Sequence, residues 1–398
     1  MILGGQVEFW IFGVMLAGIA LAHRHALAFA LLGLLTVAAY SLVFGRLHDA
    51  GPAGLASHFA REWSVLVNLF MLLLGFALLA DHFEQTHVPR VLPRILPDDW
   101  KGGLVLLALV FVLSAFLDNI AAALIGGSVA AAVFRRRVHV GFLAAIVAAA
   151  NAGGAGSVLG DTTTTMMWIK GVSATDVLLA YVAAAVAFVC FAIPAALQQQ
   201  RFAPIVRDVR AQVSLDWGRI GCVVFILAAA VATNLLVNFH WPGQAGNYPF
   251  LGVAVWIAIA LTAPLRRPRW TLLPEAARGA VFLVALVACA SLLPVETLPA
   301  ASWHTVLGLG FVSAVFDNLP LTKLALEQGG YDWDYLAYAV GFGGSMLWFG
   351  SSAGVAISTE FPEARSVSAW LRSSWYLPLA YLAGFLALLA MVGWHPHG

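Results

Sequence analysis

Long apolar stretches fill most of this chain, and short polar segments separate them. A helix that crosses the hydrocarbon core of a bilayer needs about 20 mainly apolar residues, and several runs approach or exceed that length. The pattern predicts an all-α polytopic membrane protein with roughly ten to twelve spans. The apolar runs lie near residues 7–22, 26–45, 63–80, 103–117, 120–134, 141–150, 166–197, 217–239, 249–265, 276–293, 303–316, 319–327, 334–349 and 373–393.

Composition narrows the class of protein further. Of the 398 residues, 61% are hydrophobic and only 10% are charged, and the formal net charge is +1. Soluble domains carry about 25% charged residues, so a soluble chain of this composition could not cover its surface. The composition excludes a soluble enzyme, a nucleic-acid-binding protein and a disordered chain, and it makes the lipid bilayer the expected surroundings.

Some apolar runs are too short to span a membrane, and these come in pairs. Asp118-Asn119 alone separates the runs 103–117 and 120–134, and Asp317-Asn318 alone separates 303–316 and 319–327. Short or interrupted apolar segments at corresponding places in two halves of a chain mark the binding site of many transporters. We therefore expect two re-entrant helical hairpins with polar tips.

Two motifs recur in the same order in both halves. Residues 114–119 (SAFLDN) match 313–318 (SAVFDN) at a separation of 199 residues, and the glycine pattern at 153–160 matches that at 343–350 at a separation of 190. Chance similarity between helices rich in Ala and Gly does not readily repeat both motifs in order. The sequence predicts two structural repeats, each with a hairpin and a broken transmembrane helix.

Basic residues set the expected orientation. If the N-terminus lies outside and each hairpin returns to its own side, 17 of the 21 Lys and Arg residues fall on the cytoplasmic side, including Arg135, Arg136 and Arg137. This agrees with the positive-inside rule. The two hairpins then enter from opposite faces, which makes the repeats an inverted-topology pair in a bacterial-type inner (plasma) membrane.

The repeats divide the chain into five expected segments. Scaffold helices occupy 1–101, and the first transport repeat, with the inner hairpin and a broken helix, occupies 102–197. The polar stretch 198–216 reads as a cytoplasmic linker. A second scaffold segment covers 217–302, and 303–398 holds the second transport repeat with the outer hairpin, a broken helix and a C-terminal span.

Three carboxylates lie within apolar sequence. An aspartate in the hydrocarbon region costs at least ~2.5 kcal/mol, so such residues usually serve a function. Asp118 and Asp317 occupy equivalent repeat positions, and Asp161 ends the second motif of the first half. Ser114 and Ser313 lie four residues before their aspartates. Each hydroxyl either faces the same site or bonds the backbone one turn back.

The longest polar run within apolar sequence is 151–165 (NAGGAGSVLGDTTTT). Its glycines and threonines disfavour an uninterrupted helix, and irregular backbone at membrane depth occurs only where it is buried in protein or lines a cavity. Asn151, Asp161 and the threonines would offer oxygen ligands, which hard cations prefer. The counterpart at 343–352 offers hydroxyls but no carboxylate.

Together these motifs resemble those of the NhaD-type sodium/proton antiporters. That family belongs to the ion transporter superfamily, which also contains divalent-anion/sodium symporters and arsenite permeases. The resemblance covers roughly 102–197 and 303–358. It implies two inverted repeats, a homodimeric scaffold and elevator-like movement of a transport domain. The chain departs from the family pattern at Gly156, in place of an aromatic residue, and at Val158, in place of a proline.

The resemblance also implies an ion site. Carried over by position, the residues for ion binding and proton exchange are Ser114, Asp118, Asn119, Asn151, Asp161, Thr163, Thr164, Ser313, Asp317, Asn318, Ser345 and Ser351. Within this set, the expected ligands of Na⁺ or Li⁺ are Asp118, Asn119, Asp161, Asp317 and Asn318.

Several functions fit such a membrane protein, and the broken inverted repeats disfavour a channel without excluding it. Exchange of Na⁺ (or Li⁺) for H⁺ is favoured, because an ionised carboxylate binds a cation and a protonated one is neutral. A sodium-coupled transporter of dicarboxylates or other anions is the alternative, although aspartates at the hairpin tips would repel an anion. An intramembrane aspartyl protease does not explain the repeated hairpins. We expect a transporter rather than an enzyme, with no cofactor.

Overall fold

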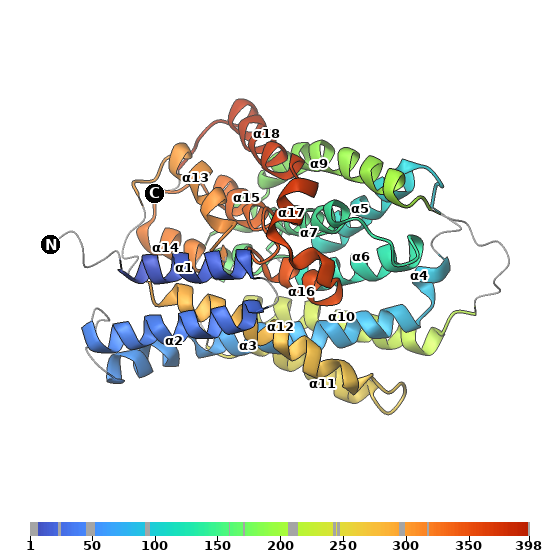
Figure 1. The fold of residues 1–398 in the computed structure, drawn as a ribbon, viewed down its shortest axis with the longest axis horizontal. Helices are drawn as coiled ribbons and strands as arrows, with labels where there is room; N and C mark the ends of the chain where they lie inside the picture. The colour runs from blue at the N-terminus through green and yellow to red at the C-terminus, as the bar shows by residue number, and fades with distance from the viewer. Residues whose placement is uncertain are drawn as a thin grey trace.

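The computed structural model describes residues 7–22, 25–44, 52–91, 96–158, 160–169, 172–205, 214–241, 244, 247–293, 299–316 and 318–396. Every regular element in this part of the chain is a helix (Figure 1). The α-helices are α1 (Val7–Leu21), α2 (Ala26–Phe44), α3 (Pro52–Gln85), α4 (Val88–Val91), α5 (Trp100–Ser114), α6 (Asn119–Val133), α7 (Val140–Gly154), α8 (Thr162–Ile169), α9 (Ala180–Phe202), α10 (Trp217–His240), α11 (Phe250–Thr262), α12 (Leu273–Ser291), α13 (Trp303–Ser313), α14 (Asn318–Gln328), α15 (Trp333–Gly343), α16 (Ser352–Glu360), α17 (Val367–Ser373) and α18 (Tyr376–Met391).

Five of these helices are long and apolar enough to cross a membrane, or six if the pair α17 and α18, bent by 57°, forms one span. The chain is therefore an integral membrane protein with fewer full-length spans among its described helices than the ten to twelve expected. Helices α5, α6 and α7 have 15 residues each. At 1.5 Å per residue each reaches only about 22 Å, which is less than the ~30 Å of the hydrocarbon core.

Most predicted runs match a helix within a few residues, and two differ. The run 166–197 is divided into α8 and α9, with the 3₁₀ turn Ala174–Val177 between them. Ser173 begins that turn by accepting a hydrogen bond from the Thr175 backbone N–H, a local bond that competes with helix formation. Helix α3 has 34 residues and is much longer than the apolar run 63–80, because its polar ends are helical as well.

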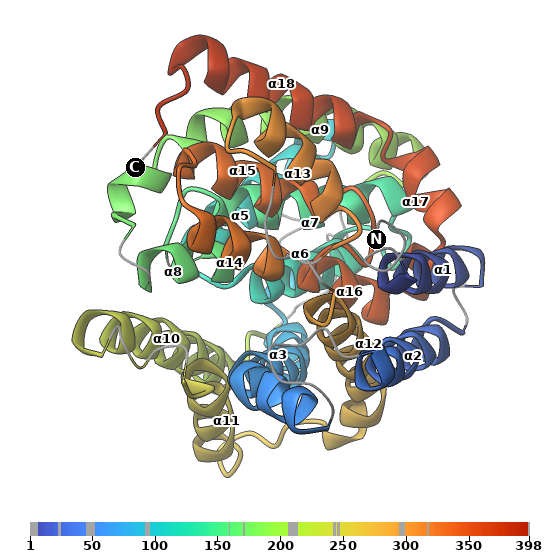
Figure 2. The same cartoon turned by 90° about the vertical axis from the view of Figure 1, so that its left-hand side faces the viewer.

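The helices are arranged in two layers (Figure 2). Helices α2, α3, α10, α11 and α12 form one layer, and α5 to α9 with α13 to α18 form a thicker body above it. Helix α16 lies where they meet. It packs closely on α6 at Gly127, where an added Cβ would lie 2.8 Å from Ile357 Cδ1, and on α12 at Gly279, where it would overlap the Thr359 hydroxyl. Small residues permit such close helix approach.

Ion pairs mark the two ends of α3. At its C-terminal end, Glu84 accepts a hydrogen bond from Arg136 at 3.3 Å, and Asp81 pairs with Arg269. Nearby, Arg266 pairs with Asp216 at 3.1 Å. The hydrogen bond from Arg266 holds the pKa of Asp216 below its usual value.

The N-terminal third of α3 carries a different ion pair. There Glu62 pairs with Lys323 of α14 at 2.5 Å. Arg136, one of the residues expected at the cytoplasmic surface, thus lies with Arg269 near the C-terminal end of α3, whereas Lys323 contacts the N-terminal third of that helix.

Candidate functional site

The first part of the site is the start of α6. Asp118 caps this helix by accepting a hydrogen bond from the Ile120 backbone N–H at 2.8 Å. The partial positive charge of a helix N-terminus favours an ionised carboxylate at this position. Asn119 follows as the first helical residue and is buried. Asp118 thus has a local role as the N-terminal cap of α6. The Asn119 side chain makes contacts with other parts of the chain.

The second part is the break between α7 and α8. The backbone leaves helical geometry after Gly154 and resumes it at Thr162. Thr164 Oγ1 donates to the Ser157 carbonyl at 2.5 Å, and Ser157 Oγ donates to the Ala115 carbonyl at 2.6 Å. These bonds satisfy carbonyls within the break and attach it to the end of α5. Thr164 therefore supports the local backbone through its hydroxyl.

Amide side chains join these two parts. Asn119 Nδ2 donates to Asn151 Oδ1 at 3.2 Å and to Asp161 Oδ1 at 3.4 Å. Asn119 is 3% exposed, Asn151 1% and Asp161 2%. The Asp118 and Asp161 carboxylates are also near enough to interact through their charges. Residues that lie more than 30 positions apart thus meet in one buried polar cluster.

The second half of the chain reaches the same cluster. Asn151 Nδ2 donates to Ser345 Oγ at 3.0 Å and to Ser351 Oγ at 3.2 Å. Both serines belong to the break between α15 and α16, and Ser351 also caps α16 by accepting from the Gly354 N–H. The Asn151 side chain is thus hydrogen-bonded to residues of both halves of the chain. We refer to Asn119, Asn151, Asp161, Ser345 and Ser351 as the polar cluster.

Ser114 and Ser313, the first serines of the repeated motif, make equivalent hydrogen bonds in the two halves of the chain. Ser114 Oγ donates to the Ala150 carbonyl, and Ser313 Oγ donates to the Val340 carbonyl, both at 2.6 Å. Each hydroxyl thus bonds a neighbouring broken helix rather than its own helix. The donors are 199 residues apart and the acceptors 190 apart, which are the separations of the two sequence motifs.

Two glycines show the same correspondence. A Cβ at Gly153 would overlap the Phe111 carbonyl oxygen, and a Cβ at Gly343 would overlap that of Gly310. Only glycine permits helices to approach this closely. The glycine motifs therefore fix the contact between α5 and α7 in one half, and between α13 and α15 in the other.

Other expected residues have different surroundings. Thr163, at the start of α8, is fully buried, and its hydroxyl has no hydrogen-bond partner in the described part of the chain, so its oxygen is available as a ligand. Asn318 begins α14 and is buried. Asp317 lies outside the described residues. The structure therefore brings five of the twelve expected residues into one hydrogen-bonded group, with Asp118 beside it.

Sequence reasoning missed a tyrosine. The Tyr181 hydroxyl of α9 donates to the Gly153 carbonyl at 3.0 Å, and its ring fills the space beside Gly156, where an added Cβ would overlap it. The chain lacks the family's aromatic residue at 156, and Tyr181 supplies an aromatic ring at that place. The only sequence signal was the glycine itself, and it did not indicate which residue fills the space.

The cluster is suited to a small hard cation. It offers carboxylate, amide and hydroxyl oxygens, which Na⁺ and Li⁺ accept as ligands. The C-terminal ends of α7 and α15 add partial negative charge, and the N-terminal ends of α6 and α16 stabilise the ionised acids. No group of three or more His, Cys, Asp or Glu residues suited to a transition metal occurs in the described ranges.

Comparison with known proteins finds relatives that are named sodium/proton antiporters. No family model matches the chain. It is 29% identical over 367 residues to sodium/proton antiporter 1 of Arabidopsis thaliana, a match covering 81% of this chain and 59% of that protein. It is 27% identical over 297 residues to the Na⁺/H⁺ antiporter NhaD of Alkalimonas amylolytica, covering 63% of this chain and 59% of that protein.

A third match is to the Na⁺/H⁺ antiporter NhaD of Vibrio parahaemolyticus, 28% identical over 302 residues, covering 63% of this chain and 71% of that protein. The chain thus spans less than two thirds of the Arabidopsis and Alkalimonas relatives. The resemblance to NhaD-type sodium/proton antiporters that the motifs indicated is confirmed by these matches.

Proposed function

We propose that this chain, a relative of the NhaD-type sodium/proton antiporters, exchanges Na⁺ or Li⁺ for H⁺ across a membrane. The observation that carries the proposal is the buried polar cluster. Asn119 donates hydrogen bonds to Asp161 and Asn151 of the first half, and Asn151 donates to Ser345 and Ser351 of the second half. Buried acids and amides at membrane depth are costly, so their convergence favours a transport site.

The mechanism follows from competition for the carboxylates. When Asp118 and Asp161 are ionised, their negative charge attracts a cation, and amide and hydroxyl oxygens complete its coordination. When protons occupy the acids, the site is neutral and releases the cation. The site can cross the membrane when it holds a cation or when its acids are protonated, but not when it is empty and negatively charged. This restriction couples the movement of the two ions. We include Asp317 and Asn318 in this site by their repeat positions.

We further propose that α5–α6 and α13–α14 are re-entrant hairpins of two inverted repeats. The short lengths of α5 and α6 support this, as do the matching bonds of Ser114 and Ser313. In Figure 1 the two helix pairs lie in opposite halves of the long axis, as inverted repeats require.

The proposed division of labour assigns 102–197 and 303–398 to a transport domain and 1–101 and 217–302 to a scaffold, with 198–216 as a linker. The two layers of Figure 2 support this division. Elevator-like movement and a homodimeric scaffold are proposed from the family resemblance. The exposed apolar face of α11, with Val253, Ile257 and Leu261, would fit either lipid or a second copy.

Reconstitution provides the direct test. Purified protein in liposomes with an imposed pH gradient should take up radioactive Na⁺ or Li⁺ when the lumen is acidic, and dissipate the gradient in proportion. Sodium-dependent uptake of succinate or citrate under the same conditions would instead establish the anion transporter. Absence of both activities from folded protein would reject the proposal.

A further inference from the structure

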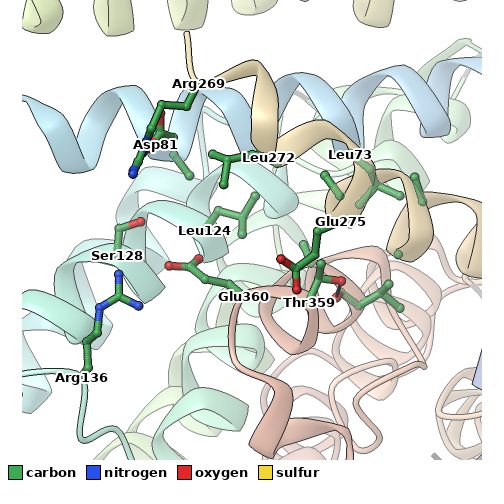
Figure 3. A pocket seen from close by; sticks show the side chains of 17 residues that line it. Leu73, Asp81, Leu124, Ser128, Arg136, Arg269, Leu272, Glu275, Thr359 and Glu360 are labelled. Atoms are coloured by element: carbon green, nitrogen blue, oxygen red, sulfur yellow. Dashed lines mark hydrogen bonds and ion pairs between the residues drawn. The ribbon is translucent and has the colours of Figure 1, made fainter. Parts of the chain in front are cut away.

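A cavity of about 310 Å³ lies between the two layers, beside α16 (Figure 3). Helices α3 and α12 supply one wall, through apolar residues such as Leu73 and Ala276, and α6 and α16 supply the other, through Leu124 and Val355 among others. At about 30 Å³ per molecule the space has room for roughly ten waters. Charged side chains also line it, so it is a place where water would be retained.

The cavity and the polar cluster are connected by two helices. Helix α16 starts beside Ser351 of the cluster and lines the cavity at Val355 and Glu360. Helix α6 starts at Asn119 of the cluster and lines the cavity at Leu124. At 1.5 Å per residue, the inner end of the cavity lies about 6–8 Å along these helices from the cluster. A proton that moves between the cluster and the cavity must cross this distance.

Glu360 is the last residue of α16, and its carboxylate points into the cavity between Leu124, Ser128 and Arg136 (Figure 3). It lies over the close contact of α6 and α16, where Glu360 Oε2 would be 3.7 Å from a Cβ built at Gly127. The Glu360 side chain thus belongs to the proposed transport domain and faces the cavity next to the proposed scaffold.

The charged groups around Glu360 have other partners. Arg136 pairs with Glu84, and Arg269 pairs with Asp81. Glu275 of α12 also points its carboxylate toward this space (Figure 3). Within the described part of the chain, neither Glu275 nor Glu360 has an ion pair within 4 Å. Glu360 is thus an acid that no basic group fixes in the ionised state, near acids on the opposite wall.

We propose that Glu360 is a proton-transfer residue for the exchange reaction. This inference rests on the proposed function. When Na⁺ binds at the cluster, a proton leaves one of the aspartates and passes through cavity water to the Glu360 carboxylate. Glu360 then gives that proton to bulk water on the arginine-rich face, and its own charge is restored. One proton is taken up and one is released at Glu360, so it ends each cycle unchanged.

Two transport modes separate this role from a structural one. Exchange of radioactive Na⁺ for unlabelled Na⁺ at equal pH needs the cluster and its movement but no net proton transfer. In Glu360→Gln we expect that mode to stay within twofold of wild type, while Na⁺/H⁺ exchange falls about tenfold or more. Small permeating buffers such as imidazole carry protons themselves. At high concentration they should restore the Na⁺/H⁺ exchange rate of Glu360→Gln.

The matched control is Glu363→Gln, an exposed acid three residues away, which should behave as wild type in both modes. Glu360→Asp, which keeps the carboxylate, should retain more than half of the Na⁺/H⁺ exchange rate. It also serves as the test if the Gln variant does not fold, because a folded Asp variant as slow as a null variant would contradict a proton-transfer role.

Two results with Glu360→Gln would overturn the inference. One is an unchanged Na⁺/H⁺ exchange rate at all pH values and buffer concentrations. The other is an equal loss of both modes that buffer does not restore, since that indicates a structural role. Failure of the proposed function itself looks different, because wild-type protein would then show no Na⁺/H⁺ exchange.

Discussion

At the scale of single residues, Asn151 connects the two halves of the site. Its amide oxygen accepts from Asn119, and its amide nitrogen donates to Ser345 and Ser351. An amide can do both at once because it carries an acceptor and two donors, which neither a carboxylate nor a hydroxyl provides in the same geometry. Loss of this side chain would leave several buried polar groups without a partner.

We expect Asn151→Ala to weaken Na⁺ binding more than tenfold. An unpaired buried polar group costs about 1–3 kcal/mol, and this change strands more than one. Isothermal titration of purified protein measures the effect. Asn247→Ala, in an exposed position of the loop before α11, is the control and should bind Na⁺ normally. Equal Na⁺ affinity of the two variants would exclude Asn151 from the site.

The carboxylates of Asp118 and Asp161 should be essential for transport. Asp118→Asn and Asp161→Asn each keep the size of the side chain but remove its charge and its titration. We expect each variant to be recovered as folded protein, with Na⁺/H⁺ exchange reduced at least a hundredfold in liposomes. Wild-type exchange by a well-folded variant would contradict the role of that aspartate.

At the scale of helices, the glycine motifs determine how closely α7 approaches α5 and α15 approaches α13. Gly153 and Gly343 each face a backbone carbonyl oxygen with no room for a Cβ. Gly308 of α13 differs, because a Cβ at that position would have no atom within 4 Å. Replacing glycine with alanine should therefore lower the stability of the protein at Gly153 and Gly343 but not at Gly308.

Gly153→Ala and Gly343→Ala should each lower the free energy of unfolding by about 1–3 kcal/mol, since the overlap forces α7 or α15 away from its neighbour. Gly308→Ala should leave stability unchanged or raise it slightly, because alanine favours helix. Thermal unfolding in detergent, followed by tryptophan fluorescence, provides the comparison. A Tm for Gly153→Ala at or above that of Gly308→Ala would contradict the close contact.

Sequence alone predicted the elements around the site well. Asp118-Asn119 and the 151–165 run were recognisable because polar residues inside apolar sequence are rare and expensive. The division of 166–197 into two helices was not, because an apolar run has the same hydropathy whether or not its backbone is continuous. Tyr181 and Glu360 were also missed, since their roles depend on which helices pack together, and no local pattern records that.

At the scale of the whole molecule, basic residues gather at one end. Arg136 and Arg269 contact the C-terminal end of α3, whereas Lys323 contacts Glu62 toward its N-terminal end. The arginine-rich end fits the cytoplasmic side by the positive-inside rule. The orientation is a prediction from the positive-inside rule, and the positions of these residues allow it to be tested.

Cysteine labelling tests that orientation. In a background with Cys190, Cys222 and Cys289 replaced by serine, the exposed positions 137 and 267 should react with a membrane-impermeant maleimide only in inside-out vesicles. Position 247, in the loop between α10 and α11, should react from the opposite side. Labelling of 137 and 267 from different sides would reject the proposed topology.

The central claim is that a cation and protons compete for the same buried acids. If they do, Na⁺ binding must release protons, and Na⁺ affinity must fall as the pH is lowered. Acids that share one site are expected to titrate as a coupled set, so the number of protons released is a property of the site as a whole.

Adding Na⁺ to purified protein in weakly buffered solution, with a pH-sensitive dye, measures this release directly. The account predicts about one to two protons per bound Na⁺, and none in the Asp118→Asn, Asp161→Asn double variant. Saturable Na⁺ binding with no proton release, at an affinity independent of pH, would contradict it.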